Sequence, residues 1–321
     1  MEKLIEVQNL KKYFQVNKKG IFGGKAYVKA VDGVSFDLYR GEVLSLVGES
    51  GCGKSTTGRL LLNLLKATDG HVSFAGEPIS QLPERLMRPK RQHMQMIFQD
   101  PYQSLNPRMR IRDLIAEPLL VHSDMSATKR RQRVLELLDM VGLPANAMEK
   151  FAHEFSGGQR QRIGIARAIA VKPQLIVADE PVSALDVSVQ SQVLNLMQDL
   201  QEQLGLTYLF ISHNLSVVEH VSNRIAVMYL GKIVEISPSA MLYQNPHHPY
   251  TKALLSAIPV PDPTYQKKRI ILQGDIPSPI QPPPGCHFHT RCGQCMEVCK
   301  SIAPELKEIE PEHFVACHLY D

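Results

Sequence analysis

The sequence lacks the features of several protein classes. No run of 18 apolar residues occurs in it, so no segment is expected to span a bilayer as a helix. Residues 1–6 carry charge where a secretory signal needs an apolar stretch, and we therefore expect the chain to stay in the cytosol. The 36 Lys and Arg against 32 Asp and Glu leave a net charge of +4, too balanced to argue for nucleic-acid binding. Up to residue 285 the chain has a single cysteine, Cys52.

The composition is that of a globular protein with a buried core. Of its residues, 44% are hydrophobic and 21% are charged. The length of 321 residues is enough for one large or two modest domains. Strands are predicted at residues 4–7, 34–38, 43–47, 94–99, 175–178 and 207–212, with a hairpin of 225–229 and 232–236. Helices are predicted at residues 55–65, from Ser126 to a stop at Gly142, and at 189–204. This alternation predicts a parallel α/β sheet with antiparallel strands at both ends of the chain.

A glycine-rich segment follows the strand predicted at residues 43–47 and precedes a predicted helix. Gly48 to Ser55 fits the pattern G-x-x-x-x-G-K-[ST] in the strand-to-helix context that this pattern requires. Such a loop turns its backbone N–H groups towards an anion, and the positive end of the helix adds to the attraction. Lys54 would then reach the β- and γ-phosphates of a nucleotide, and Ser55 would hold Mg²⁺. The alternative is a tight turn with an exposed lysine; Cys52 is interpreted as a small filler in either case.

Polar residues also follow two of the predicted strands. Asp179 and Glu180 end the strand at residues 175–178, where open α/β sheets bind ligands. Asp179 suits Mg²⁺ through water, and Glu180 suits orienting or deprotonating an attacking water, although an acidic pair at this place can also cap a helix. His213 follows the strand at residues 207–212 at the same sheet edge. It is either a structural histidine or a contact to the γ-phosphate.

A further motif, Phe155-Ser156-Gly157-Gly158-Gln159, immediately precedes a predicted helix at residues 160–170 and forms a second anion-binding helix start. Together with the two earlier motifs it resembles the ATPase subunits of ABC transporters. The resemblance covers residues 1–240 and implies an α/β fold, an ABC-type P-loop ATPase domain with a mixed sheet core, an antiparallel β subdomain and a helical subdomain at about 108–170. Residues 241–321 would be an oligopeptide-transporter-type C-terminal extension with a proline-rich linker and a four-cysteine metal site.

The resemblance implies a role for individual residues, with ATP and Mg²⁺ as the ligands. The implied catalytic residues are Lys54, Gln99, the catalytic glutamate Glu180 and the switch histidine His213. The implied nucleotide contacts are Phe14, Gly48, Ser50, Gly51, Cys52, Gly53, Lys54, Ser55, Thr56, Ser156, Gly157, Gly158, Gln159 and the D-loop residue Asp186. The implied Mg²⁺ ligands are Ser55, Gln99 and Asp179. Phe14 would stack on adenine, with Tyr13 as the second choice.

The partners also follow from the resemblance. ABC ATPase domains work in head-to-tail pairs, so a chain with one copy of each motif needs a second ATPase subunit, for which a paralogue in a heterodimer is expected. Residues 98–108 and 248–255 look like segments of the dipeptide and oligopeptide importers. This implies peptide import with two transmembrane permease subunits and an extracytoplasmic peptide-binding protein, and a peripheral location on the cytoplasmic face of the bacterial inner membrane. Haem, nickel or glutathione as cargo, or a soluble ABC ATPase, are the alternatives.

Five cysteines gather in the last 36 residues, after a segment with ten prolines between Pro246 and Pro284. In a reducing cytosol such a cluster indicates a metal site. Cys292, Cys295 and Cys299 would share one face of a helix. The resemblance instead implies a [4Fe–4S] cluster on Cys286, Cys292, Cys299 and Cys317, with Cys295 as a substitute. Zinc on the same thiolates and free structural cysteines are the alternatives, and a structural brace is preferred to an iron sensor.

Overall fold

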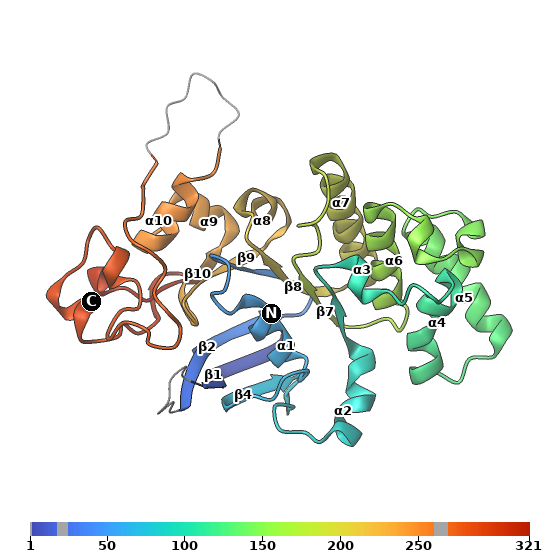
Figure 1. Cartoon of the computed structure of the whole chain (residues 1–321), viewed down its shortest axis with the longest axis horizontal. Coiled ribbons are helices and arrows are strands. Elements are labelled where there is room, and N and C mark those ends of the chain that lie inside the picture. Colours follow the sequence, from blue (N-terminus) through green and yellow to red (C-terminus); the bar gives the residue numbers. More distant parts are fainter. Residues whose placement is uncertain (1, 18–24, 260–268) are drawn as a thin grey trace. The chain divides into compact units, whose positions relative to one another are not determined.

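The computed structural model describes residues 2–17, 25–259 and 269–321 (Figure 1). These residues form two compact units. The first unit comprises Glu2, Tyr39–Val43 and Leu82–Ile211, and the second comprises the described residues within Lys3–Leu38, Leu44–Gln81 and Ser212–Asp321. Two prolines of the proline-rich segment, Pro261 and Pro263, lie outside the described residues. In the described part of the chain, no helix combines the length and the hydrophobicity needed to cross a membrane.

The first unit contains a parallel sheet of β6 (Met94–Ile97), β7 (Leu175–Asp179) and β8 (Thr207–Ser212). Strand β7 lies in the middle, and all five of its residues are buried. Its register pairs Ala178 with Ile97 of β6 and Asp179 with Ile211 of β8. Because parallel strands end at one edge, the residues that follow β6 and β7 lie near each other.

The helices of the first unit are α2 (Glu84–Lys90), α3 (Pro101–Ser104), α4 (Ile111–His122), α5 (Ala127–Met140), α6 (Gly157–Ile169) and α7 (Val187–Leu204). Helices α4, α5 and α6 pack against one another. All three lie within residues 108–170, the region predicted to be a helical subdomain. The predicted start of α5 is confirmed, because the Ser126 side chain accepts a hydrogen bond from the backbone N–H of Lys129. Val134, Leu137 and Leu138 form its buried face.

The second unit begins with a four-stranded sheet in the order β2-β1-β4-β5. Its strands are β1 (Lys3–Asn17), β2 (Lys25–Tyr39), β4 (Asp69–Phe74) and β5 (Glu77–Pro78). The strands predicted at residues 4–7 and 34–38 were therefore too short, since β1 and β2 each have 15 residues. Helix α1 (Lys54–Leu61) is shorter than predicted, because Asn63 adopts a left-handed conformation with a φ of 51°.

The second sheet of this unit joins the C-terminal residues to the rest of the unit. Its order is β3 (Val43–Val47), β9 (Arg224–Tyr229), β10 (Lys232–Pro238), β12 (His313–Val315) and β11 (Lys307–Glu310). The predicted hairpin is confirmed: Leu230 and Gly231 have φ values of 42° and 81°, the conformation of a type I′ turn. The described residues of this unit also form helices α8 (Leu215–Val221), α9 (Ser239–Gln244) and α10 (Pro249–Ser256).

The cysteine-rich segment is not one helix. It contains two short 3₁₀ turns, His289–Arg291 and Glu297–Lys300, and only Cys299 lies within either of them. The prediction that Cys292, Cys295 and Cys299 share a helix face is therefore wrong. Cys295 is exposed, whereas Cys299 is buried.

The packing of the helical region generates a prediction for two matched leucines. Leu137 in α5 is fully buried, and Leu120 in α4 is 57% exposed. We expect Leu137→Ala to lower the free energy of unfolding by about 2–5 kcal/mol, because the lost side chain leaves a cavity. Leu120→Ala should change it by no more than about 0.5 kcal/mol. Urea unfolding followed by circular dichroism measures both, and equal losses would contradict the packing.

Candidate functional site

The glycine-rich loop lies in the second unit, between β3 and α1. Gly48 and Gly53 have φ values of 151° and 108°. A Cβ atom at Gly48 would lie 2.1 Å from the carbonyl oxygen of Met228, and one at Gly53 would lie 2.1 Å from that of Ala30. No side chain fits at such distances, so both positions require glycine. The loop is thus packed tightly against the backbone of β9 and β2.

Lys54, the first residue of α1, is buried beside this loop. Its Nζ atom donates hydrogen bonds to the carbonyl oxygens of Gly48 at 2.8 Å and Glu49 at 3.0 Å. The Sγ atom of Cys52 lies 3.7 Å from the same ammonium group, and burial raises the pKa of this thiol. Ser55 and Thr56 follow in the first turn of the helix, where backbone N–H groups favour an anion. The loop therefore combines a fixed cation with a helix N-terminus.

The C-terminal extension contacts the loop through an ion pair. Arg291 donates to the two carboxylate oxygens of Glu49, from Nη1 at 2.7 Å and from Nη2 at 3.1 Å. Hydrogen bonding to Glu49 raises the pKa of Arg291, so the guanidinium stays charged. The backbone N–H of Glu49 donates to the hydroxyl group of Tyr250 at 2.9 Å. One loop residue is thus held by two residues more than 200 positions away.

The turn between β9 and β10 connects the same two regions. The N–H of Gly231 donates to the carbonyl oxygen of Cys52 at 3.0 Å, and Nδ1 of His287 lies 3.0 Å from the carbonyl oxygen of Leu230. Phe288 packs in a buried aromatic group with Tyr229 and Tyr250, with ring centroids 5.2 and 5.4 Å from its own. The extension is therefore part of the packing around the loop.

In the first unit, the predicted Gln99 and Glu180 are in contact. Nε2 of Gln99 donates to Oε2 of Glu180 at 2.9 Å. Glu180 has a φ of 46°, a backbone conformation that is strained for a residue with a side chain. Its backbone N–H donates to the carbonyl oxygen of Ile211 at 2.9 Å. The preceding Asp179 is 2% exposed at the end of β7. Two carboxylates and an amide thus lie at one sheet edge.

The Ser156–Gln159 segment forms the start of α6 as a capping box. The hydroxyl of Ser156 accepts from the N–H of Gln159 at 3.3 Å, and the side chain of Gln159 accepts from the N–H of Ser156 at 3.0 Å. Gly157 and Gly158 occupy the first turn. Asp186 is the N-cap residue of α7, where its carbonyl oxygen accepts from the N–H of Gln190 at 2.8 Å.

The remaining predicted residues lie in the second unit. Phe14 is an exposed residue of β1, with the ammonium group of Lys12 located 5.1 Å from its ring centroid. Tyr13, the second choice, donates its hydroxyl hydrogen to Asp32. His213 is an exposed residue directly after β8. The loop, Phe14 and His213 thus belong to one unit, whereas Gln99, Glu180 and the segment that begins α6 belong to the other.

The predicted cysteine ligands lie near one another. Burial is the largest cause of the raised pKa values of Cys286, Cys292 and Cys317, and the charge of Cys299 raises all three pKa values further. Burial, the largest cause, raises the pKa of Cys286 to about 11. Three of the thiols accept a backbone N–H from the residue two positions later, namely Phe288, Gln294 and Leu319. Cys295 is exposed and interacts with fewer of the other thiols.

Sequence reasoning missed Glu49, Arg291 and Tyr250. Glu49 lies within the glycine-rich motif at a position that the motif leaves open, and Arg291 lies beside Cys292. Glu49 and Arg291 are 242 positions apart, so no local sequence pattern could have predicted their contact. Tyr250 lies in a segment used for the resemblance but received no role of its own.

Comparisons with known proteins cover almost the whole chain. Residues 31–183 match the family described as ABC transporter, and residues 234–299 match the oligopeptide/dipeptide transporter C-terminal region. The oligopeptide transport ATP-binding protein AppF of Bacillus subtilis is 54% identical over 99% of this chain and 98% of its own length. The dipeptide transport ATP-binding protein DppF of Haemophilus influenzae is 49% identical over 99% of this chain and 97% of its own length.

A solved structure agrees with the predicted fold. The dimeric post-hydrolysis state of the ATP-binding cassette MJ0796, bound to ADP and Pi, has a TM-score of 0.65 at 29% identity and covers 74% of this chain and 99% of that chain. The predicted family and fold class are both confirmed. The chain belongs to the ABC transporter ATPase family, as an ATP-binding and ATP-hydrolysing subunit with the C-terminal region of oligopeptide and dipeptide transporters.

Proposed function

We propose that this chain hydrolyses ATP to power the import of dipeptides and oligopeptides. The observation that supports this cargo is the match of residues 234–299 to the oligopeptide/dipeptide transporter C-terminal region, in a chain that also carries the ATPase motifs. The relatives in B. subtilis and H. influenzae are named for oligopeptide and dipeptide transport, respectively. As a subunit of such an importer, the chain would lie at the cytoplasmic face of the bacterial inner membrane as a peripheral protein.

The proposed assembly contains other chains. One copy of each ATPase motif calls for a second ATPase subunit, and we infer a paralogue in a heterodimer. The related cassette MJ0796 is itself described as dimeric. Two transmembrane permease subunits would carry the peptide, and an extracytoplasmic binding protein would deliver it. The proposed domain division is an ATPase domain at residues 1–240 and an extension at residues 241–321.

The proposed chemistry is phosphoryl transfer from ATP to water. Lys54 would exchange its two loop carbonyl partners for oxygens of the β- and γ-phosphates. Ser55, Asp179 and Gln99 carry the oxygen donors that Mg²⁺ prefers, and the ion would neutralise charge on the phosphates. Ser156 and the two glycines after it would bind the ATP held by the partner ATPase domain. His213 would contact the γ-phosphate, and Phe14 would stack on adenine.

The contact between Gln99 and Glu180 would couple hydrolysis to the permease. Glu180 would orient or deprotonate the attacking water, and its carboxylate is held by the amide of Gln99. Gln99 precedes the loop that leads into α3, in the segment that resembles the peptide importers. A displacement of this loop would therefore turn the carboxylate of Glu180 towards or away from the water.

We also propose that Cys286, Cys292, Cys299 and Cys317 bind a [4Fe–4S] cluster. Four thiolates are the ligand set of such a cluster, and these four cysteines act on one another electrostatically. Backbone N–H groups directed at three of the sulfurs would stabilise the charge of the thiolates and tune the cluster. The cluster would act as a structural brace of the extension. Zinc on the same thiolates is the chemical alternative.

Glu180→Gln tests the catalytic proposal. The amide keeps the shape of the side chain but cannot act as a base, so we expect ATP hydrolysis by the reconstituted importer to fall by about 10²–10⁴-fold while ATP binding persists. Glu202→Gln, on an exposed part of α7, is the matched control and should leave hydrolysis unchanged. Phosphate release in vesicles with peptide and binding protein measures both, and wild-type turnover by Glu180→Gln would contradict the role.

Arg291→Ala tests whether the C-terminal extension supports the glycine-rich loop. Removing the guanidinium leaves the Glu49 carboxylate without its two hydrogen bonds from Arg291, so this part of the loop is held less firmly. We expect the Kd for ATP to rise roughly tenfold, which corresponds to about 1.4 kcal/mol. Arg291→Lys should restore part of this only, because an ammonium group cannot bind both oxygens in the same fork geometry.

Lys300→Ala is the control for this experiment, since Lys300 forms an exposed ion pair with Glu297 in the same extension. Isothermal titration with ATP compares the variants. Equal affinities for Arg291→Ala and Lys300→Ala would show that the extension does not support the loop.

Metal analysis tests the cluster. We expect the chain purified without oxygen to contain about four iron and four sulfide per protein. Cys286→Ser and Cys317→Ser should lose both, whereas Cys295→Ser, at the exposed position, should keep them. Zinc alone, or no metal, would contradict the cluster and leave the ATPase proposal intact.

A further inference from the structure

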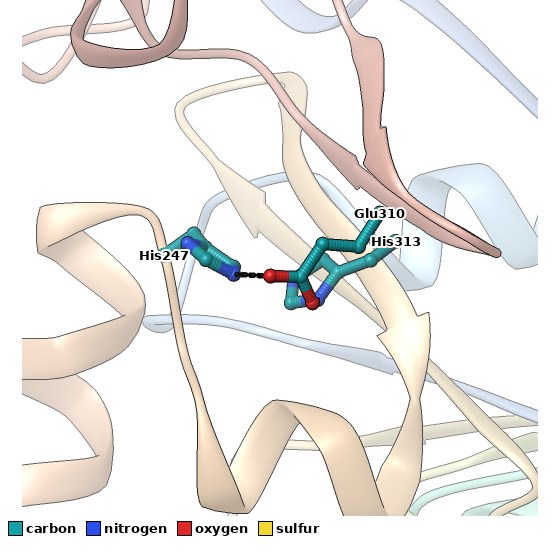
Figure 2. Close-up of side chains that lie close together, drawn as sticks. All are labelled: His247, Glu310 and His313. Atoms are coloured by element: carbon teal, nitrogen blue, oxygen red, sulfur yellow. Dashed lines mark ion pairs between the residues drawn. The ribbon is translucent and has the colours of Figure 1, made fainter.

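The hairpin β11–β12 brings two potential metal ligands next to a third from the residues before α10 (Figure 2). Glu310 is the last residue of β11, His313 is the first of β12, and His247 lies two positions before α10. One ligand atom of each lies within 4.8 Å of the other two. Figure 2 shows the carboxylate of Glu310 pointing towards both imidazole rings.

The distances between the nitrogen and oxygen atoms of these side chains are close to the distances between the ligand atoms of a bound zinc ion. Nε2 of His247 lies 3.4 Å from one oxygen of Glu310, and Nδ1 of His313 lies 4.0 Å from the other. A tetrahedral zinc with bonds of ~2.0–2.1 Å holds its ligand atoms about 3.3 Å apart. The three side chains would therefore need to move by less than about 1 Å to share one zinc ion.

His313 supplies an independent observation. Its side chain is fully buried, and its Nδ1 atom has no hydrogen-bond partner. Its Nε2 atom lies 2.7 Å from Oε1 of the buried Glu235. Because a carboxylate accepts, Nε2 carries the hydrogen in the neutral ring, and Nδ1 presents a lone pair. This lone pair faces Glu310 and His247, where a cation would satisfy it.

Glu235 provides the support that metal-binding histidines have in proteins. A ligating histidine commonly donates its other N–H to a carboxylate, which fixes the tautomer and the orientation of the ring. Glu235 is fully buried and also accepts the backbone N–H groups of His247 at 2.8 Å and His248 at 3.0 Å. The same carboxylate thus orients the ring of His313 and fixes the backbone that carries His247.

A simple ion pair accounts for these contacts less well. A protonated His247 would pair with Glu310, and the amide of Asn245 lies 3.2 Å from the same Nε2 atom. Neither contact reaches Nδ1 of His313, which lies 4.0 Å from Oε2 of Glu310, beyond hydrogen-bond distance. A metal ion satisfies all three ligand atoms at once, and it would take the place of the exposed Asn245 amide at Nε2 of His247.

We propose that His247, Glu310 and His313 form a zinc site. Two imidazole nitrogens and one carboxylate oxygen are a ligand set typical of zinc, with water in the fourth position because Glu310 is partly exposed. The ion would clamp the C-terminal hairpin to the segment before α10. This site is separate in its residues from the cysteines proposed to hold iron and sulfide.

X-ray absorption at the zinc edge tests the proposal on the full chain. The protein is treated with a chelator, equilibrated with Zn²⁺ and desalted. We expect a zinc with a shell of nitrogen and oxygen at ~2.0–2.1 Å, which the double variant His247→Gln/Glu310→Gln lacks. The control His71→Gln/Glu77→Gln removes the same residue types from exposed positions of the same unit and should keep this zinc.

A second measurement concerns the orienting carboxylate. In Glu235→Gln the amide can donate to Nε2 of His313, which would place the ring hydrogen on Nδ1 and remove the lone pair. We expect zinc affinity to fall by roughly 10–100-fold in a competition titration. Added Zn²⁺ should also slow amide hydrogen exchange in residues 307–315 of the wild type, but not in the double variant.

Two results would overturn the proposal. One is a zinc content that does not differ between the wild type and the His247→Gln/Glu310→Gln variant. The other is a wild-type absorption spectrum with sulfur at ~2.3 Å and no nitrogen and oxygen shell, which would assign zinc to the cysteines. The spectrum of the wild type decides even if a variant fails to fold.

Discussion

The close fit of the glycine-rich loop (residues 48–55) against two neighbouring strands is the constraint on which the second unit depends. The carbonyl oxygens of Met228 and Ala30 leave room only for glycine at positions 48 and 53, so the curve of the loop follows from strands β9 and β2. The ammonium group of Lys54 then donates hydrogen bonds to the carbonyl oxygens of Gly48 and Glu49 at the start of the loop. The loop is shaped before a nucleotide arrives, and less ordering remains to be done on binding. Its shape is consequently sensitive to anything that shifts β9 or the β9–β10 turn.

The C-terminal extension acts on this same loop. Arg291 is largely buried, and removing either partner of a buried ion pair leaves a charge without compensation. The pair with Glu49 therefore holds the extension and the loop in one arrangement. Arg291 directly precedes the proposed cluster ligand Cys292, so the backbone around the cluster also sets where the guanidinium lies. A segment outside the ATPase motifs is thus in direct contact with the loop that we propose to bind the nucleotide.

Local patterns in the sequence predicted most of the regular elements. The apolar strands β7 and β8, the cap at Ser126 and the Leu230-Gly231 turn all depend on neighbouring residues, and each was found. Strands β1 and β2 were predicted too short, because their extra length alternates weakly between buried and exposed positions. The Glu49–Arg291 pair arises from the tertiary fold alone. The cysteine spacing suggested a helix face, but the segment folds as short turns around its thiols.

The two proposed metal sites of the extension differ in chemistry and in the loop that each closes. Thiolates suit iron–sulfur clusters, whereas imidazole and carboxylate suit zinc, so the two ligand sets select different occupants. The proposed cysteine ligands all lie between residues 286 and 317, so a cluster on them would organise the extension internally. His247 and Glu310 are 63 positions apart and enclose all of the proline-rich segment except Pro246. Because the entropy of closing a loop grows with its length, a clamp at this second site would close a longer loop of the unfolded chain than the cysteines do. The cluster would therefore shape the extension, and the zinc would attach it to the segment before α10.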